Sequence, residues 1–341
     1  MGESWKDLGK KDPKYQKAYD TLLQTPRPAT PAELRAIYSA AKSANGNSGS
    51  SYEDNGRIIA EDISIPLRDG TTTKARLHRS KNAAAEPAPL AVIIHGGGYI
   101  TGDRFDESWT CQILVEEIGA VALAIEYRRA PEHPFPTAIH DAWDAVKWAA
   151  ENAETLGADP TKAGFIVGGN SAGGNLATVI GYLAKQENFS PSITGLAIQV
   201  PVISGEAGLP EHLRPELQSY AGSGVDAPIM NSNDVRMFLG HYDPDLTSPL
   251  FNPWAPGVDL SGYPPVFFQI AGMDPLRDEG LLFERHLRQE YSVATQLKVY
   301  SALPHAFWFI PLPEFADAIE QARLDYRQGV RWLMEQKMND A

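Results

Sequence analysis

The feature that most constrains this chain is a pair of apolar runs that each end in a glycine-rich turn. Residues 90–94 run into His95-Gly96-Gly97-Gly98-Tyr99, and residues 165–167 run into Gly168-Gly169-Asn170-Ser171-Ala172-Gly173. Short, wholly apolar runs are typical of buried strands in a parallel sheet. Glycines flank Ser171 because a tight strand-to-helix turn leaves no room for Cβ atoms beside the serine. The pair therefore predicts a buried sheet that presents a serine next to a loop of unblocked backbone N–H groups.

Strand and helix patterns alternate along most of the chain beyond residue 90. This alternation predicts right-handed crossovers and an α/β fold whose mostly parallel sheet is covered by helices on both faces. Two earlier strand patterns are separated by Arg68-Asp69-Gly70, which predicts that the chain enters the sheet as an antiparallel hairpin. The predicted strands cover residues 58–67, 72–77, 90–94, 120–125, 165–167, 196–200, 266–270 and 296–300, and a final helix covers residues 313–336.

Two segments depart from this alternation. Residues 1–55 are polar, with helical patches followed by a flexible stretch rich in Gly, Asn and Ser over residues 43–51. Residues 204–257 are rich in Pro, Gly, Asn and Asp, and a long irregular stretch inside a compact core is typical of an inserted lid. We therefore expect an N-terminal cap segment (1–55), a first part of the catalytic core (56–203), a lid inserted after the sixth strand (204–257), and a second part of the core (258–341).

Composition narrows the class of function. The formal net charge of −13 argues against a nucleic-acid partner, because binding to a phosphate backbone depends on Lys and Arg. The single cysteine, Cys111, excludes an internal disulfide, and no metal-ligand spacing or dinucleotide fingerprint is present. The first residues lack a signal peptide's apolar core, and no stretch reaches the roughly 18 apolar residues of a membrane span. We expect a cytoplasmic protein with no stable membrane anchor, no metal and no cofactor.

Ser171 needs a base and an orienting carboxylate before its hydroxyl can act as a nucleophile. His305 follows the last predicted strand, and Asp274 follows the strand before it, at the edge where sites of open α/β sheets assemble. An alternative role for Asp274 is to cap the helix that begins next to it. Asp278 and Glu279 come a helical turn later, and we interpret them as capping or ion-pairing residues. The chain order Ser171, Asp274, His305 is the order found in α/β-hydrolases.

These motifs resemble the hormone-sensitive-lipase-like family of carboxylesterases. The resemblance covers residues 57 to about 335, and it rests on the two glycine-rich turns, on Asp274-Pro-Leu-Arg-Asp-Glu-Gly, on the late His305 and on Tyr127-Arg-Arg-Ala-Pro-Glu-His-Pro-Phe-Pro. It implies an α/β-hydrolase fold and hydrolysis of a carboxylic ester through an acyl-enzyme. It also implies that the N–H groups of Gly97, Gly98 and Ala172 form the oxyanion hole.

Three positions depart from the family pattern. Asn170 stands where Asp usually precedes the nucleophile, Ala306 where Gly commonly follows the base, and Arg129 where Leu is frequent. None of them removes an atom of the predicted triad, so we expect activity to be retained. His95 is expected to fix the glycine loop rather than to contact substrate.

Aromatic residues near these motifs are candidates for an apolar substrate pocket. We expect Tyr99, Trp308, Phe238 and Tyr220 to line it, with ordinary packing as the alternative for each.

The triad leaves several functions open. The chain can be a simple carboxylesterase acting on a small-molecule ester, or a specialised-metabolite esterase, thioesterase or acyltransferase with the same triad. A remote alternative is a non-catalytic ligand-binding receptor. The resemblance extends to receptors that keep this fold but have lost the catalytic histidine, and the presence of His305 argues against that role here. The sequence leaves the oligomeric state open, with a homodimer as one outcome.

Overall fold

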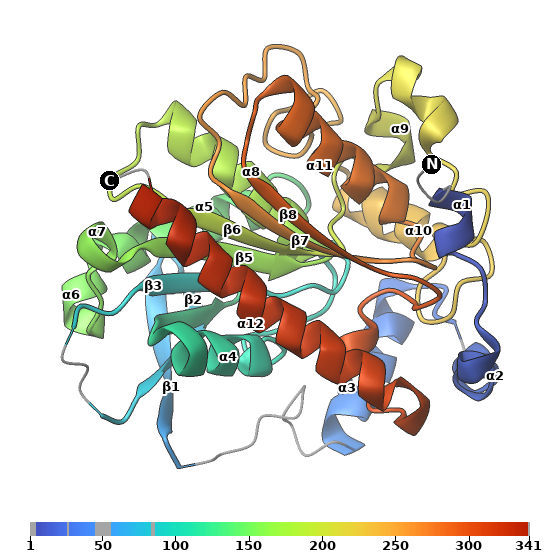
Figure 1. Cartoon of the computed structure of the whole chain (residues 1–341), viewed down its shortest axis with the longest axis horizontal. Helices are drawn as coiled ribbons and strands as arrows, with labels where there is room; N and C mark the ends of the chain where they lie inside the picture. Colours follow the sequence, from blue (N-terminus) through green and yellow to red (C-terminus); the bar gives the residue numbers. More distant parts are fainter. Residues whose placement is uncertain (1–4, 26, 45–55, 83–85, 340–341) are drawn as a thin grey trace.

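The computed structural model describes residues 5–25, 27–44, 56–82 and 86–339, and its centre is an eight-stranded sheet (Figure 1). The strand order is β1-β2-β4-β3-β5-β6-β7-β8. β1 pairs antiparallel with β2 and β2 with β4, whereas the other neighbours are parallel, so the predicted entry hairpin and parallel core are both confirmed. The strands are β1 (Ile58–Pro66), β2 (Thr72–Ser80), β3 (Leu90–Ile94), β4 (Val121–Ile125), β5 (Phe165–Asn170), β6 (Gly195–Gln199), β7 (Val266–Ala271) and β8 (Thr295–Tyr300).

Helices cover both faces of the sheet. α4 (Ser108–Ile118) and α12 (Ala316–Asn339) lie on one face, and α5 (Thr137–Glu151), α8 (Ala172–Gln186) and α11 (Arg277–Glu290) lie on the other (Figure 1). Strand β3 is wholly apolar because its successive side chains point to opposite faces of the sheet, and helices cover both faces. Its residues 90, 92 and 94 join one hydrophobic cluster and residues 91 and 93 join the other.

Smaller elements complete the chain. The short helices α6 (Ala153–Leu156) and α7 (Pro160–Ala163) lead into β5, and the 3-10 turns η3 (Phe307–Phe309) and η4 (Pro313–Phe315) precede α12. The last helix therefore begins three residues later than the sequence pattern predicts, because Pro313 opens a separate 3-10 turn. Among the described residues, no helix is long and apolar enough to cross a membrane.

The two segments that break the alternation lie outside the sheet. The N-terminal segment contains α1 (Trp5–Leu8), η1 (Pro13–Tyr15), α2 (Gln16–Leu23) and α3 (Pro31–Ala44), and the insertion contains α9 (Gly205–Gly208), η2 (Glu211–Glu216) and α10 (Ser232–Tyr242). Arg27 joins the two segments through Asp234 and the carbonyl of Ala227. Most of the predicted flexible stretch, from residue 45 onward, lies outside the described residues.

Strand register brings the sequence motifs together at one edge of the sheet. Ile94 of β3 pairs with Gly169 of β5, so the glycine loop and the serine turn leave the sheet side by side. Ala271 of β7 pairs with Tyr300 of β8, which brings the loops that carry Asp274 and His305 together in the same way. Parallel pairing therefore assembles residues that are more than a hundred positions apart in the chain.

Candidate active site

Ser171 lies at the turn between β5 and α8 in a backbone conformation that few L-residues adopt. Its φ is 56° and its ψ is −115°, and strain of this kind costs roughly 1–3 kcal/mol. A Cβ on Gly169 would lie 2.3 Å from the carbonyl oxygen of Gly173, and a Cβ on Gly173 would lie 2.0 Å from that of Ile94. Both approaches are too close for any side chain, so the two glycines are required for the turn that holds Ser171.

Three side chains from three loops form a hydrogen-bonded chain. His305 Nε2 lies 3.0 Å from Ser171 Oγ, and His305 Nδ1 lies 2.6 Å from Asp274 Oδ2. The N–H of Leu276 donates to the other oxygen of Asp274 at 2.9 Å. With its Nδ1–H donated to the carboxylate, the imidazole has only Nε2 left as an acceptor, and this atom faces the serine hydroxyl. The geometry thus suits removal of the Ser171 proton.

Asp274 does not cap α11, which was the alternative role for it. The helix begins at Arg277 and its N-cap residue is Leu276. Asp274 instead lies in the preceding turn, fully buried, with one oxygen on the Leu276 N–H and the other on His305. Its local hydrogen bond therefore fixes the carboxylate in the position that the imidazole needs.

The N-terminal segment contacts the loop that carries His305. The N–H of Ala302 donates to the carbonyl of Leu8 at 2.8 Å, and the hydroxyl of Tyr19 donates to the carbonyl of Ala302 at 2.6 Å. The N–H of Met273 donates to the carbonyl of Leu303 at 2.9 Å and ties the aspartate loop to the histidine loop. Sequence reasoning missed these contacts, because a leucine and a tyrosine in a polar segment carry no signal of them.

The glycine loop follows β3 and lies beside Ser171. Gly97 and Gly98 have φ values of 102° and 60°, a region that favours glycine. The carbonyl of Gly97 accepts hydrogen bonds from both the N–H and the hydroxyl of Thr101. Within the part of the chain that the structure describes, no group accepts the N–H groups of Gly97, Gly98 or Ala172. These three donors are therefore free to bind a negatively charged oxygen.

His95 packs behind this loop rather than against the serine. Its ring stacks on Tyr127 with centroids 4.3 Å apart, and its Nδ1 lies 2.7 Å from the carbonyl oxygen of Gly96. The hydroxyl of Tyr127 donates to the carbonyl of His95. Burial lowers the pKa of His95, so its imidazole is neutral near pH 7. The contacts fit the expected role of His95 in holding the loop.

The four predicted pocket aromatics occupy different places. Tyr99 is fully buried and stacks on Tyr242 with ring centroids 3.8 Å apart. Trp308 is buried among the aromatic residues beneath α12. Phe238 of α10 lies against the glycine loop, because a Cβ on Gly98 would come within 2.6 Å of its ring. Tyr220 is buried and lines a cavity within the insertion.

Glu279 connects α11 to the insertion. Its Oε2 accepts the N–H groups of Ile203, Ser204 and Gly205 at 2.9, 2.8 and 3.0 Å, and its Oε1 accepts the hydroxyl of Tyr220 at 2.8 Å. Burial raises the pKa of Glu279, and these hydrogen bonds oppose that shift. The predicted capping or ion-pairing role is therefore wrong for Glu279. This residue instead makes long-range hydrogen bonds that hold the first residues of the insertion.

Asp278 makes both the predicted ion pair and hydrogen bonds to the insertion. Its Oδ1 accepts Arg277 Nε at 2.7 Å, which agrees with the predicted ion pair. Its Oδ2 accepts the N–H groups of Gln218 and Ser219 at 2.7 and 2.6 Å, so this residue also holds the insertion. The start of α11 is thus joined to the insertion at two points, five residues or fewer beyond Asp274.

Comparison with protein-family models gives one match. Residues 91–309, most of the chain, match a model described as the alpha/beta hydrolase fold.

Several proteins of known name are similar to this chain. An AB hydrolase superfamily protein of Schizosaccharomyces pombe, B1A11.02, is 37% identical, over 81% of this chain and 80% of that protein. The versiconal hemiacetal acetate esterase of Dothistroma septosporum is 28% identical, over 90% of each chain. The ethyl acetate hydrolase of Pseudomonas putida is 34% identical, over 75% of this chain and 80% of that protein.

A solved structure gives a close match in fold. The crystal structure of vibralactone cyclase superposes with a TM-score of 0.85 at 28% identity and covers 98% of this chain and 97% of that one.

Proposed function

The chain belongs to the α/β-hydrolase fold family and is a carboxylic ester hydrolase, and we propose that Ser171, His305 and Asp274 carry out the hydrolysis through an acyl-enzyme. The observation that carries this proposal is the continuous hydrogen-bonded chain from Ser171 Oγ through His305 to Asp274. These hydrogen bonds also argue against a non-catalytic receptor, because the base is present and in contact with the nucleophile.

Acylation begins when Ser171 Oγ attacks the ester carbonyl while His305 Nε2 takes its proton. Asp274 keeps the Nδ1–H of His305 directed toward itself and stabilises the imidazolium that forms. His305 then returns the proton to the departing alcohol. In the second half, His305 removes a proton from the water that attacks the acyl-enzyme. It then returns this proton to Ser171 Oγ as the acyl–oxygen bond breaks, which releases the acid and restores the serine.

The oxyanion of each tetrahedral intermediate is assigned to the N–H groups of Gly97, Gly98 and Ala172. Their lack of acceptors within the described residues supports this assignment. Loss of one such donor costs roughly 3–4 kcal/mol of transition-state stabilisation. Side chains at Gly97 and Gly98 would meet Thr101 and Phe238, so the loop conformation depends on glycine at both positions.

We assign the cap to residues 1–55 and 204–257, flanked by core parts 56–203 and 258–341. Contacts of the N-terminal segment with the His305 loop, and of the insertion with α11 and the glycine loop, support this division. Phe238 is the predicted pocket residue whose placement best fits contact with a substrate. Tyr99, Tyr220 and Trp308 are buried, so a role for them in the pocket would be through packing.

A second candidate function is a specialised-metabolite role with the same triad. The observation that favours it is that a cyclase structure covers 98% of this chain and that an esterase named for a hemiacetal acetate covers 90% of it. Acyl transfer to an internal or added alcohol in place of water would distinguish this role. A cytoplasmic location and a homodimer stay predictions from the sequence.

The proposal is tested by replacing the nucleophile. Ser171→Ala should abolish turnover of a short p-nitrophenyl ester while circular dichroism and the unfolding midpoint stay close to those of the wild type. Ser261→Ala, in an exposed turn, is the matched control and should keep wild-type turnover. Turnover that survives in the Ser171 variant would exclude the mechanism.

A further inference from the structure

A cavity lies beside the glycine loop, between α3, the first residues of β2 and the segment that follows β4. Its volume is about 870 Å³, which is within the range of small-molecule sites. Its walls come from α3, from residues 72–74 of β2, from residues 101–104, and from residues 126–133 that follow β4. Ser171, Asp274 and His305 do not line it, so it is distinct from the site proposed for ester hydrolysis.

The lining of this cavity is basic although the chain is acidic. Six Lys or Arg side chains line it against three Asp or Glu side chains, whereas the whole chain has 30 Lys and Arg against 43 Asp and Glu. A cation in a concave site attracts an anion where no carboxylate already neutralises it. The cationic residues are Arg35, Lys42, Lys74, Arg104, Arg128 and Arg129.

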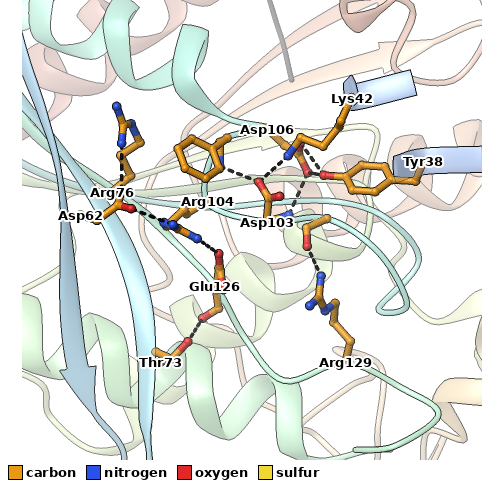
Figure 2. A network of polar contacts seen from close by, with 12 residues as sticks. Tyr38, Lys42, Asp62, Thr73, Arg76, Asp103, Arg104, Asp106, Glu126 and Arg129 are labelled. Carbon is orange, nitrogen blue, oxygen red and sulfur yellow. Dashed lines mark hydrogen bonds and ion pairs between the residues drawn. The ribbon is translucent and has the colours of Figure 1, made fainter. Parts of the chain in front are cut away.

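Four of these six cations already have carboxylate partners. Figure 2 shows Lys42 of α3 reaching the loop of Asp103 and Asp106, with its Nζ 2.5 Å from Asp103 and 3.0 Å from Asp106. The same view shows Arg104 between Asp62 and Glu126. The remaining two pairs are Arg35 with Glu132 and Arg128 with Asp69 and Asp141.

Arg129 and Lys74 differ from the other four. The Arg129 guanidinium is half-buried and donates to the carbonyl of Gly102 (Figure 2), which uses one of its five N–H donors. Lys74 is exposed on β2. Neither side chain has a carboxylate partner anywhere in the described ranges. Arg129 is also the residue that stands where leucine is frequent in the family, and the hydrolytic mechanism gives it no role.

We propose that this cavity binds a small organic anion, whose carboxylate or phosphate group pairs with Arg129 and Lys74. A guanidinium presents parallel donors that match either group, and an ion pair formed there would satisfy a cation that has no carboxylate partner among the described residues. The cavity is much larger than one such group, so the ligand has a polar organic body that reaches the hydroxyl-bearing wall of Tyr38 and Thr72. Thr101, which holds Gly97, also lines the cavity and places the ligand next to the glycine loop.

Isothermal titration calorimetry on the full-length protein tests this proposal. Citrate and glycerol 3-phosphate are the two anionic probes, glycerol is the neutral probe, and sodium chloride keeps the ionic strength constant. We expect saturable binding of at least one anion and none of glycerol. Binding of citrate alone identifies a carboxylate ligand, binding of glycerol phosphate alone identifies a phosphate ligand, and binding of both identifies a general organic-anion site.

Variants locate the site. Lys74→Ala removes an exposed cation and should raise the Kd for the anion about tenfold. Arg129→Leu should raise it by a similar factor. Lys81→Ala, just beyond the opposite end of β2, is the matched control and should bind as the wild type does. The proposal is wrong if neither anion binds at constant ionic strength, if both cavity variants bind as tightly as the control, or if the wild-type protein loses binding once a fluorophosphonate has modified it.

Discussion

Replacing Asp274 by Asn isolates the orienting function of the carboxylate, because the two residues have the same shape. Asp274 has donors on both oxygens, the Leu276 N–H and the His305 Nδ1–H. Asparagine has one oxygen and one NH₂ group. If its oxygen stays on Leu276, the NH₂ group faces Nδ1 and forces the proton onto Nε2, so the imidazole can no longer accept the proton of Ser171.

The size of the effect follows from these two contacts. Turning the amide to restore the productive tautomer places its NH₂ group against the Leu276 N–H, and a buried donor left unsatisfied costs about 1–3 kcal/mol. The neutral amide also loses the charge-assisted hydrogen bond to the imidazolium, worth about 1.5–3 kcal/mol. Together these losses amount to a decrease in kcat of roughly 10² to 10⁴-fold.

Steady-state hydrolysis of p-nitrophenyl butyrate measures this decrease, with circular dichroism as a check on folding. Asp144→Asn is the matched control, because Asp144 is also a mostly buried carboxylate that accepts a backbone N–H and an arginine, but it lies on α5 with Arg68 as its partner. We expect the control to keep kcat within a factor of about two. A loss of less than tenfold for Asp274→Asn in a folded protein would refute the assigned role.

Three further predictions follow from other contacts. Ala306 has a φ of 49° in the loop after His305, a left-handed conformation that is strained for alanine and not for glycine. Ala306→Gly should therefore raise the free energy of unfolding by up to about 1 kcal/mol in urea titrations, and a decrease would show that this strain is absent. Glu279→Ala leaves three backbone donors at the start of the insertion without their acceptor and should lower the free energy of unfolding by about 3–5 kcal/mol. Glu279→Gln keeps one oxygen as an acceptor and should cost less. Equal losses for the two variants would show that these hydrogen bonds are not the cause. Burial lowers the pKa of His78 to about 4, so the unfolded chain binds a proton below about pH 6.5 that the folded chain does not, and stability falls as the pH drops from 6.5 toward 4. Between pH 7 and pH 5 this loss is about 2 kcal/mol, and His78→Leu should abolish that part of the pH dependence; an unchanged dependence would contradict the assignment.

The strands and the reacting side chains could be predicted from the sequence because local patterns specify both. A buried parallel strand is apolar throughout, and the residue that follows it emerges at the edge of the sheet, so Ser171, Asp274 and His305 could each be placed at a strand end. Parallel register then brings them together without any further information. The glycines beside Ser171 could be interpreted for the same reason, since their necessity is a matter of local space.

Contacts between distant polar segments left no such pattern. Glu279 and a capping glutamate look the same in the sequence, because only the position of the insertion decides that three backbone N–H groups from residues 203–205 converge on it. The contacts of Leu8 and Tyr19 with the His305 loop join residues almost three hundred positions apart. Aromatic type likewise does not distinguish a pocket from a core, and the buried stack of Tyr99 on Tyr242 is the example here.

The central claim is that Ser171 forms a covalent acyl-enzyme, and trapping this intermediate tests it most directly. The protein is mixed with p-nitrophenyl butyrate, quenched in acid within the first turnovers, digested, and analysed by mass spectrometry. We predict one butyryl group on the peptide that contains Ser171, and none on that peptide from Ser171→Ala. Rapid p-nitrophenol release with an unmodified Ser171 peptide, or acylation at another residue, would contradict the account.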